Sequence, residues 1–183
     1  CALPISGHVD FSYEVEKSLQ ACEGAILLID AAQGIQTQTV ANATLAMDQE
    51  MEVIPVLNKI DLAHARPEEV LEQLEHVLLL ESESCISCSA KTGKGVGELI
   101  EAVVDKVPAP TGDSDNPLRA LIFDAKYDEY RGVIVNLRMV DGVIHKGDMV
   151  HMLGAQADYE VLELGKFTPG PKPCDSLEPG EVG

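Results

Sequence analysis

The chain has 183 residues, of which 45% are hydrophobic and 24% charged, and its formal net charge is −18. This composition is typical of a globular protein with a sizeable core and excludes a disordered chain, while so acidic a surface argues against non-specific binding to phosphate backbones. Its apolar runs are strand-sized and no basic leader precedes one, so we expect neither a membrane-spanning helix nor a signal peptide.

In the first part of the chain, segments with helical periodicity alternate with short apolar runs typical of buried strands. Strands are predicted at 25–30, 53–58 and 85–90. Helices are predicted at 11–22, 36–49, 67–80 and 96–106. Strands that alternate with helices predict an α/β fold, in which helices cover both faces of a parallel sheet.

The pattern changes after residue 107. The stretch 108–116 is rich in Pro, Asp and Ser and is typical of a linker. Strand patterns without helices follow, first at 119–125 and 132–140, and Asp141-Gly142 between two apolar runs predicts a β-hairpin. Short strands at close spacing predict a small antiparallel β-barrel over 117–183.

One polar motif, Asn58-Lys59-Ile60-Asp61, follows a predicted strand directly, at the sheet edge where open α/β folds bind ligands. The Asp61 carboxylate can accept hydrogen bonds from N1–H and N2–H of guanine, whereas adenine presents an acceptor at N1. Asn58 can donate to the other base edge and brace the neighbouring loop, and the stem of Lys59 can lie along the base or sugar. A plain surface turn is the alternative for this motif taken alone.

A second motif, Ser89-Ala90-Lys91, follows the next predicted strand, one β-α unit later. There the backbone N–H of Ala90 can donate to O6 of guanine, and the hydroxyl of Ser89 can hold Asp61 in place. Two such loops in this order favour a site for a guanine nucleotide over two unrelated turns.

A third motif, Gly7-His8-Val9-Asp10, precedes the first predicted helix. Glycine permits close approach of the backbone to a γ-phosphate, and His8 can position the attacking water in phosphoryl transfer. A lone histidine is usually structural, so this interpretation depends on the two guanine motifs.

Together the three motifs resemble the third, fourth and fifth motifs of a translational GTPase. Within that group, three longer stretches resemble the LepA (elongation factor 4) family: QACEGAILLIDAAQGIQTQTVAN, RALIFDAKYDEYRGVIV and LGKFTP. The resemblance runs from Gly7 to Gly183. It implies a P-loop GTPase-type sheet, incomplete at its N-terminus, over 7–107, and a second-domain β-barrel, also incomplete, over 117–183.

The resemblance implies that the intact protein binds GTP with Mg²⁺ and hydrolyses GTP to GDP and phosphate on the ribosome during protein synthesis. It makes His8 the catalytic residue. It assigns nucleotide binding to residues from all three motifs: Gly7, Asn58, Lys59, Asp61, Ser89, Ala90 and Lys91. It places the metal ligands mainly in a missing N-terminal part. It further implies a cytoplasmic monomer, contact with tRNA through missing domains, and peripheral association with the inner face of the cell membrane.

The start of the chain departs from the family pattern. The family carries Asp-Thr-Pro before the motif glycine, where this chain has Pro4-Ile5-Ser6, and the phosphate-binding loop and first switch are absent. We therefore expect a fragment that does not hydrolyse GTP by itself. Because Ala-Leu-Pro-Ile-Ser matches a translated sequencing adapter, we expect residues 1–6 to be non-native.

Three alternatives stay open at this point. One is another translational GTPase, of the EF-G or TypA/BipA type. Another is a truncated, non-catalytic module that binds the ribosome or guanine nucleotides. The third is an organellar homologue.

The five cysteines are irregularly spaced and odd in number, so we expect a reducing compartment rather than a disulfide framework. Cys85 and Cys88 lie three residues apart on a predicted strand, which places them on opposite faces and argues against a metal site.

Overall fold

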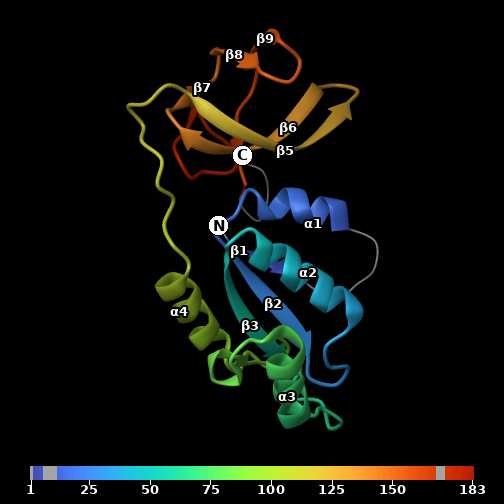
Figure 1. Cartoon of the computed structure of the whole chain (residues 1–183). Helices are drawn as coiled ribbons and strands as arrows, with labels where there is room; N and C mark the ends of the chain where they lie inside the picture. The colour runs from blue at the N-terminus through green and yellow to red at the C-terminus, as the bar shows by residue number, and fades with distance from the viewer. Residues whose placement is uncertain (1, 6–11, 168–171) are drawn as a thin grey trace. The chain divides into compact units, whose positions relative to one another are not determined.

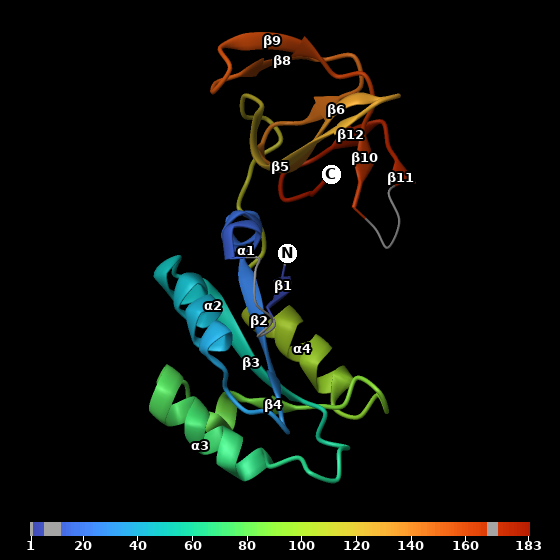
Figure 2. The ribbon, with the colours of Figure 1, turned by 90° about the vertical axis from the view of Figure 1, so that its right-hand side faces the viewer.

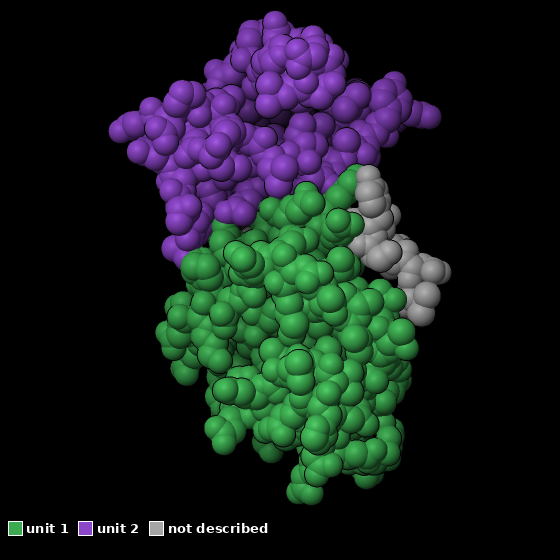
Figure 3. Space-filling model, viewed as in Figure 1, with its two compact units in different colours: residues 1–108 green, residues 109–183 purple. Residues whose placement is uncertain are grey.

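The computed structural model describes residues 2–5, 12–167 and 172–183. The chain divides into two compact units, residues 1–108 and residues 109–183 (Figure 3).

The first unit is built on a parallel sheet (Figure 1). Its strands, in spatial order, are β1 (Ala2–Ile5), β2 (Gly24–Asp30), β3 (Glu52–Asn58) and β4 (Ile86–Ser87). Its helices are α1 (Ser12–Leu19), α2 (Thr37–Asp48), α3 (Pro67–Leu78), the short 3₁₀ helix η1 (Ser82–Ser84) and α4 (Val96–Lys106). The predicted parallel α/β sheet is therefore confirmed.

Helices cover both faces of this sheet, and Figure 2 shows α2 and α3 on one side of the strands and α4 on the other. Alternate residues of a strand point to opposite faces, so Leu27 and Ile29 of β2 pack with α1, α2 and α3. Ile26 and Leu28 pack on the other face, where α4 contributes Leu99 and Val103. A strand buried on both faces must be apolar throughout, which explains the continuous apolar run of β2.

The helices of this unit lie within the ranges predicted for them. The strand predicted over 85–90 is shorter, because only Ile86 and Ser87 pair with β3. Beyond them the backbone turns into a loop, where the N–H of Ser89 donates to the carbonyl of Lys94 at 2.9 Å. The edge strand β1 pairs in parallel with β2, with Ala2 opposite Gly24. The non-native origin of residues 1–6 stays a prediction.

The second unit consists of antiparallel strand pairs. The pairs are β5 (Arg119–Asp128) with β6 (Gly132–Asp141), β7 (Ile144–His145) with β12 (Ser176–Leu177), β8 (Met149–Met152) with β9 (Ala157–Glu160), and β10 (Gly165–Lys166) with β11 (Lys172–Pro173). Leu137, Met139, Ile144 and Leu177 form its buried core. In the described part of this unit every sheet has two strands and none is closed, so the barrel stays a prediction.

The hairpin predicted at Asp141-Gly142 is wrong. Gly142 does turn the chain, with a φ of +69°, but β7 then pairs with β12 and places Ile144 opposite Leu177 in the core. The hairpin partner of β6 is β5 instead, and Asp128 stabilises the turn between them by accepting hydrogen bonds from two backbone N–H groups at 2.9 Å. Burial of Ile144 therefore outweighs the local turn preference at 141–142.

None of the helices among the described residues combines the length and apolarity that crossing a bilayer requires.

Candidate functional site

The candidate site lies where neighbouring parallel strands end together at one edge of the sheet. Asp30 ends β2 and stands opposite Asn58, the last residue of β3. Ser87 of β4 stands opposite Leu57, so the loop that begins at Cys88 emerges beside Asn58. The register of the sheet thus brings the two predicted base-recognition loops to the same edge, where open α/β sheets bind ligands.

The two loops meet through Ser89 and Asp61. The hydroxyl of Ser89 donates to Oδ1 of Asp61 at 2.7 Å and accepts a hydrogen bond from the N–H of Thr92 at 3.2 Å. The hydrogen bond from Ser89 lowers the pKa of the Asp61 carboxyl, and the positive charge of Lys91 adds to this effect. Ser89 is buried while Asp61 is exposed, so a fixed hydroxyl orients an ionised carboxylate that faces solvent.

A second contact joins the loops through the side chain of Asn58. Its Oδ1 accepts a hydrogen bond from the N–H of Ala90 at 3.0 Å and lies 3.7 Å from the sulfur of Cys88. Among the residues that the structure describes, no acceptor takes the amide N–H groups of Asn58, which leaves them able to donate to a ligand. The N–H that the sequence assigns to a base oxygen is engaged with Asn58 here, so donation to a base would require it to be shared or exchanged.

Lys59 makes an ion pair that the sequence did not predict. Its backbone has a φ of +66°, in the left-handed region, and its Nζ lies 2.6 Å from Oδ2 of Asp30. The other oxygen of Asp30 accepts backbone N–H groups from Ala32 at 2.8 Å and Gln33 at 3.3 Å. Burial raises the pKa of Asp30, but the hydrogen bonds from Lys59 and the two N–H groups outweigh it and lower the pKa overall. The only sequence signal for Asp30 was a charge at the end of an apolar strand.

The loop that carries Ser89 depends on a glycine that sequence reasoning also missed. The N–H of Gly93 donates to the carbonyl of Ser89 at 2.8 Å, which closes the turn. Gly95 has a φ of +74°, and a Cβ built on it would lie 2.2 Å from the carbonyl oxygen of Ser87. Only glycine fits so close to the strand that leads into Ser89.

The other predicted site residues are Lys91, Gly7 and His8. Lys91 is exposed, and its charge acts on Asp61 without a direct hydrogen bond. Gly7 and His8 lie outside the described residues.

The cysteine pair behaves as two separate apolar residues. Cys85 packs among the side chains beneath α1, α2 and α3, and Cys88 packs on the opposite face, as predicted. Neither lies within β4, however, because that strand consists only of Ile86 and Ser87. Burial raises the pKa of Cys85 to about 11 and also raises the pKa of Cys88. Both thiols are therefore neutral near pH 7. In the part of the chain that the structure describes, no group of three or more His, Cys, Asp or Glu side chains is placed to hold a metal ion.

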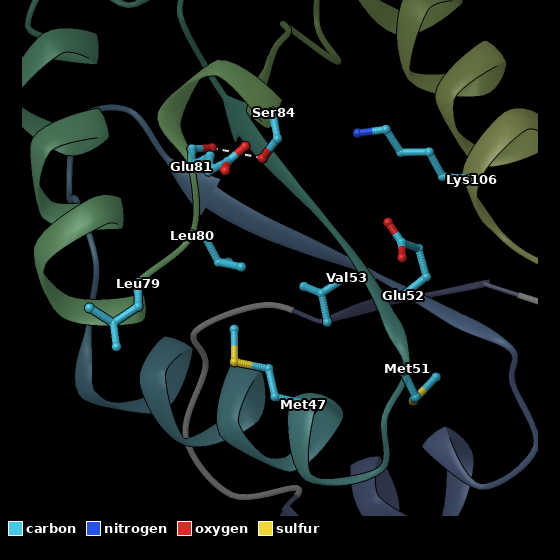
Figure 4. A pocket seen from close by; sticks show the side chains of 9 residues that line it. All are labelled: Met47, Met51, Glu52, Val53, Leu79, Leu80, Glu81, Ser84 and Lys106. Carbon is cyan, nitrogen blue, oxygen red and sulfur yellow. Dashed lines mark hydrogen bonds between the residues drawn. The ribbon is translucent and has the colours of Figure 1, made fainter.

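A hollow of about 330 Å³ lies away from this edge (Figure 4). Glu52 and Val53, at the start of β3, line it together with Lys106 of α4. Val53 and Asn58 lie five residues apart on the same strand, and this spacing corresponds to about 16 Å. The hollow therefore belongs to the opposite end of the sheet.

A family model described as the elongation factor Tu GTP binding domain matches residues 4–109, which is more than half of the chain. The chain belongs to the elongation factor Tu GTP-binding domain family. The matched range includes both loops of the candidate site.

The relatives of this chain include proteins named elongation factor 4. Over 177 residues it is 52% identical to that of Geobacillus thermodenitrificans, and 51% identical to those of Bacillus velezensis and Bacillus subtilis. Each alignment covers 97% of this chain but 29% of the relative, so the chain spans less than a third of their length. The predicted resemblance to the LepA (elongation factor 4) type is confirmed.

Proposed function

We propose that the first unit binds a guanine nucleotide at the carboxyl edge of its sheet. The observation that carries this proposal is the pairing of Ser89 with Asp61 at 2.7 Å. Together with the 3.0 Å contact between Ala90 and Asn58, it joins two loops that lie 28 or more residues apart in the sequence. Such a pairing orients a carboxylate and an amide toward the same solvent-facing edge.

Base selection follows from the hydrogen-bonding capacity of these groups. An ionised carboxylate only accepts hydrogen bonds, so Asp61 matches the two donors of guanine, N1–H and N2–H, and rejects adenine. The amide N–H groups of Asn58, which no described residue accepts, complement the acceptor edge of the base. The stems of Lys59 and Lys91 can contact its faces or the sugar.

The intact protein, in this proposal, hydrolyses GTP to GDP and phosphate in translation, as a factor of the elongation factor 4 type. Gly7 approaches the γ-phosphate and His8 positions the attacking water. α1, which follows them, moves as the second switch and is ordered by the γ-phosphate. The identity to proteins named elongation factor 4 supports this part.

A magnesium ion would neutralise charge on the phosphates of the bound nucleotide. The described acidic residues at this edge do not fit as its ligands, because Asp30 is paired with Lys59 and Asp61 with Ser89. The ligands of this ion are therefore assigned to other parts of the protein.

The second unit is proposed to be the small β-barrel of domain 2, which carries the switch motion to the ribosome. The proposal also includes ribosome binding, contact with tRNA through further domains, a monomeric state and a cytoplasmic location. Peripheral association with the membrane follows from the family resemblance alone.

The deciding experiment exchanges the base preference in the full-length protein that contains this chain. In Asp61→Asn an amide N–H of the side chain would face N2–H of guanine, which is also a donor. The same N–H would instead donate to the 2-oxo group of xanthine. We expect Asp61→Asn to weaken GDP binding by roughly 100-fold or more and to strengthen binding of xanthosine diphosphate.

The matched control is Asp105→Asn, which removes the same charge from an exposed position on α4. This control should bind GDP like the wild type. The proposal fails if the wild type binds ADP as well as GDP, or if Asp61→Asn leaves GDP affinity unchanged.

A further inference from the structure

The ion pair between Asp30 and Lys59 joins the ends of two adjacent strands. Lys59 directly follows β3 and Asp30 ends β2, and the 2.6 Å contact connects residues 29 positions apart in the sequence. The backbone supports the same junction, because the N–H of Ala31 donates to the carbonyl of Asn58 at 2.8 Å. The pair therefore lies beside the amide that faces the proposed base site.

The two partners differ in how firmly they are held. The side chain of Asp30 is 18% exposed, and two backbone N–H groups fix its other oxygen. The side chain of Lys59 is 52% exposed and has a flexible four-carbon stem. Asp30 is thus the fixed anchor, and Lys59 is the group whose position the contact determines.

The backbone of Lys59 is also held at this junction. A non-glycine residue in the left-handed region carries strain, which the surrounding contacts must compensate. The N–H of Leu62 donates to the carbonyl of Lys59 at 3.1 Å, and the ammonium contact with Asp30 fixes the side chain. Without Asp30 the stem of Lys59 would be free to leave the edge of the sheet.

We infer that Asp30 is a positioning residue of the guanine-nucleotide site, which holds the ammonium of Lys59 so that the lysine stem forms one wall of the base site. This inference rests on the proposed function. Asp30 itself does not contact the nucleotide, and its effect on binding passes through Lys59.

A double-mutant cycle on the full-length protein separates this role from a structural one. The four proteins are the wild type, Asp30→Asn, Lys59→Met and the double variant, and the measurement is the equilibrium affinity and dissociation rate of a fluorescent GDP analogue. We expect Asp30→Asn to weaken binding by roughly threefold to tenfold, mainly through faster dissociation. In the background of Lys59→Met, Asp30→Asn should have no further effect on GDP affinity, because the ammonium that Asp30 holds is absent.

Two controls sharpen the test. Asp30→Asn keeps an oxygen that can accept the N–H groups of Ala32 and Gln33, so its thermal unfolding should match that of the wild type; Lys59→Met, which removes the same ion pair and leaves these two hydrogen bonds in place, should weaken GDP binding at least as much. Asp105→Asn should leave GDP affinity at the wild-type value.

The inference is overturned if Asp30→Asn binds GDP like the wild type, or if its effect simply adds to that of Lys59→Met. Failure of the proposed function is distinguishable, because Asp61→Asn would then also leave GDP binding unchanged. If Asp61→Asn weakens GDP binding and the cycle shows no coupling between Asp30 and Lys59, only the role inferred for Asp30 is refuted.

Discussion

Replacement of Gly95 by alanine should both destabilise the first unit and weaken nucleotide binding. The added Cβ would lie 2.2 Å from the carbonyl oxygen of Ser87 and 3.1 Å from the Cα of Cys88. Both are backbone atoms, so relief requires the strand end itself to move. The φ of +74° adds the cost of a left-handed alanine, about 1–2 kcal/mol.

Together the strain and the clash predict a loss of roughly 2–4 kcal/mol in the free energy of unfolding. For a domain of this size that loss lowers the melting temperature by roughly 10–20 °C. Because the displaced backbone leads directly into Ser89, we also expect GDP affinity to fall in the protein that remains folded.

The matched control is Gly97→Ala in α4, two residues further along. A Cβ at Gly97 meets no atom within 4 Å, and alanine favours a helix over glycine by about 0.5–1 kcal/mol. Thermal unfolding of both variants in the full-length protein measures the difference. A wild-type melting temperature for Gly95→Ala, or an equal loss of stability in Gly97→Ala, would contradict the clash.

Three other predictions concern the site and its surroundings. Ser89→Ala should raise the pKa of Asp61 toward its ordinary value. In the proposed site the ionised carboxylate accepts hydrogen bonds from the base, so binding should be lost as the pH falls through its pKa. A pH titration of GDP affinity should therefore show the loss at a higher pH than in the wild type; an unshifted profile contradicts this. His8→Ala should slow ribosome-stimulated GTP hydrolysis by roughly 100-fold or more with unchanged GDP affinity, and equal losses in both would argue against a catalytic role. Cys85, whose pKa is raised to about 11, should react slowly with maleimide at pH 8 in the native protein and rapidly after unfolding; fast native labelling would contradict its burial.

Local patterns accounted for the order and type of the elements in the first unit. Continuous apolar runs identified β2 and β3, and 3.6-residue periodicity identified α2, α3 and α4. The same sequence placed two polar motifs at strand ends, which is enough to expect them at one edge of a parallel sheet. Residue chemistry then predicted a preference for guanine, since donors and acceptors are properties of side chains and not of the fold.

Pairings between distant segments could not be obtained in this way. A turn signal at Asp141-Gly142 predicts a hairpin, yet burial of Ile144 against Leu177 pairs β7 with β12. The length of β4 likewise depended on where the loop after Ser87 found its own hydrogen bonds. Such outcomes depend on which surfaces pack together, and short-range periodicity contains no information about that.

The sequence by itself thus determined the fold class of the first unit and the family, because each depends on residue types at short spacing. Only the tertiary structure showed that Asp30 holds Lys59, that Asn58 accepts the N–H of Ala90, and that Gly95 lies against the strand before Ser89. These contacts arise from the register of parallel strands, which brings together residues that lie far apart along the chain.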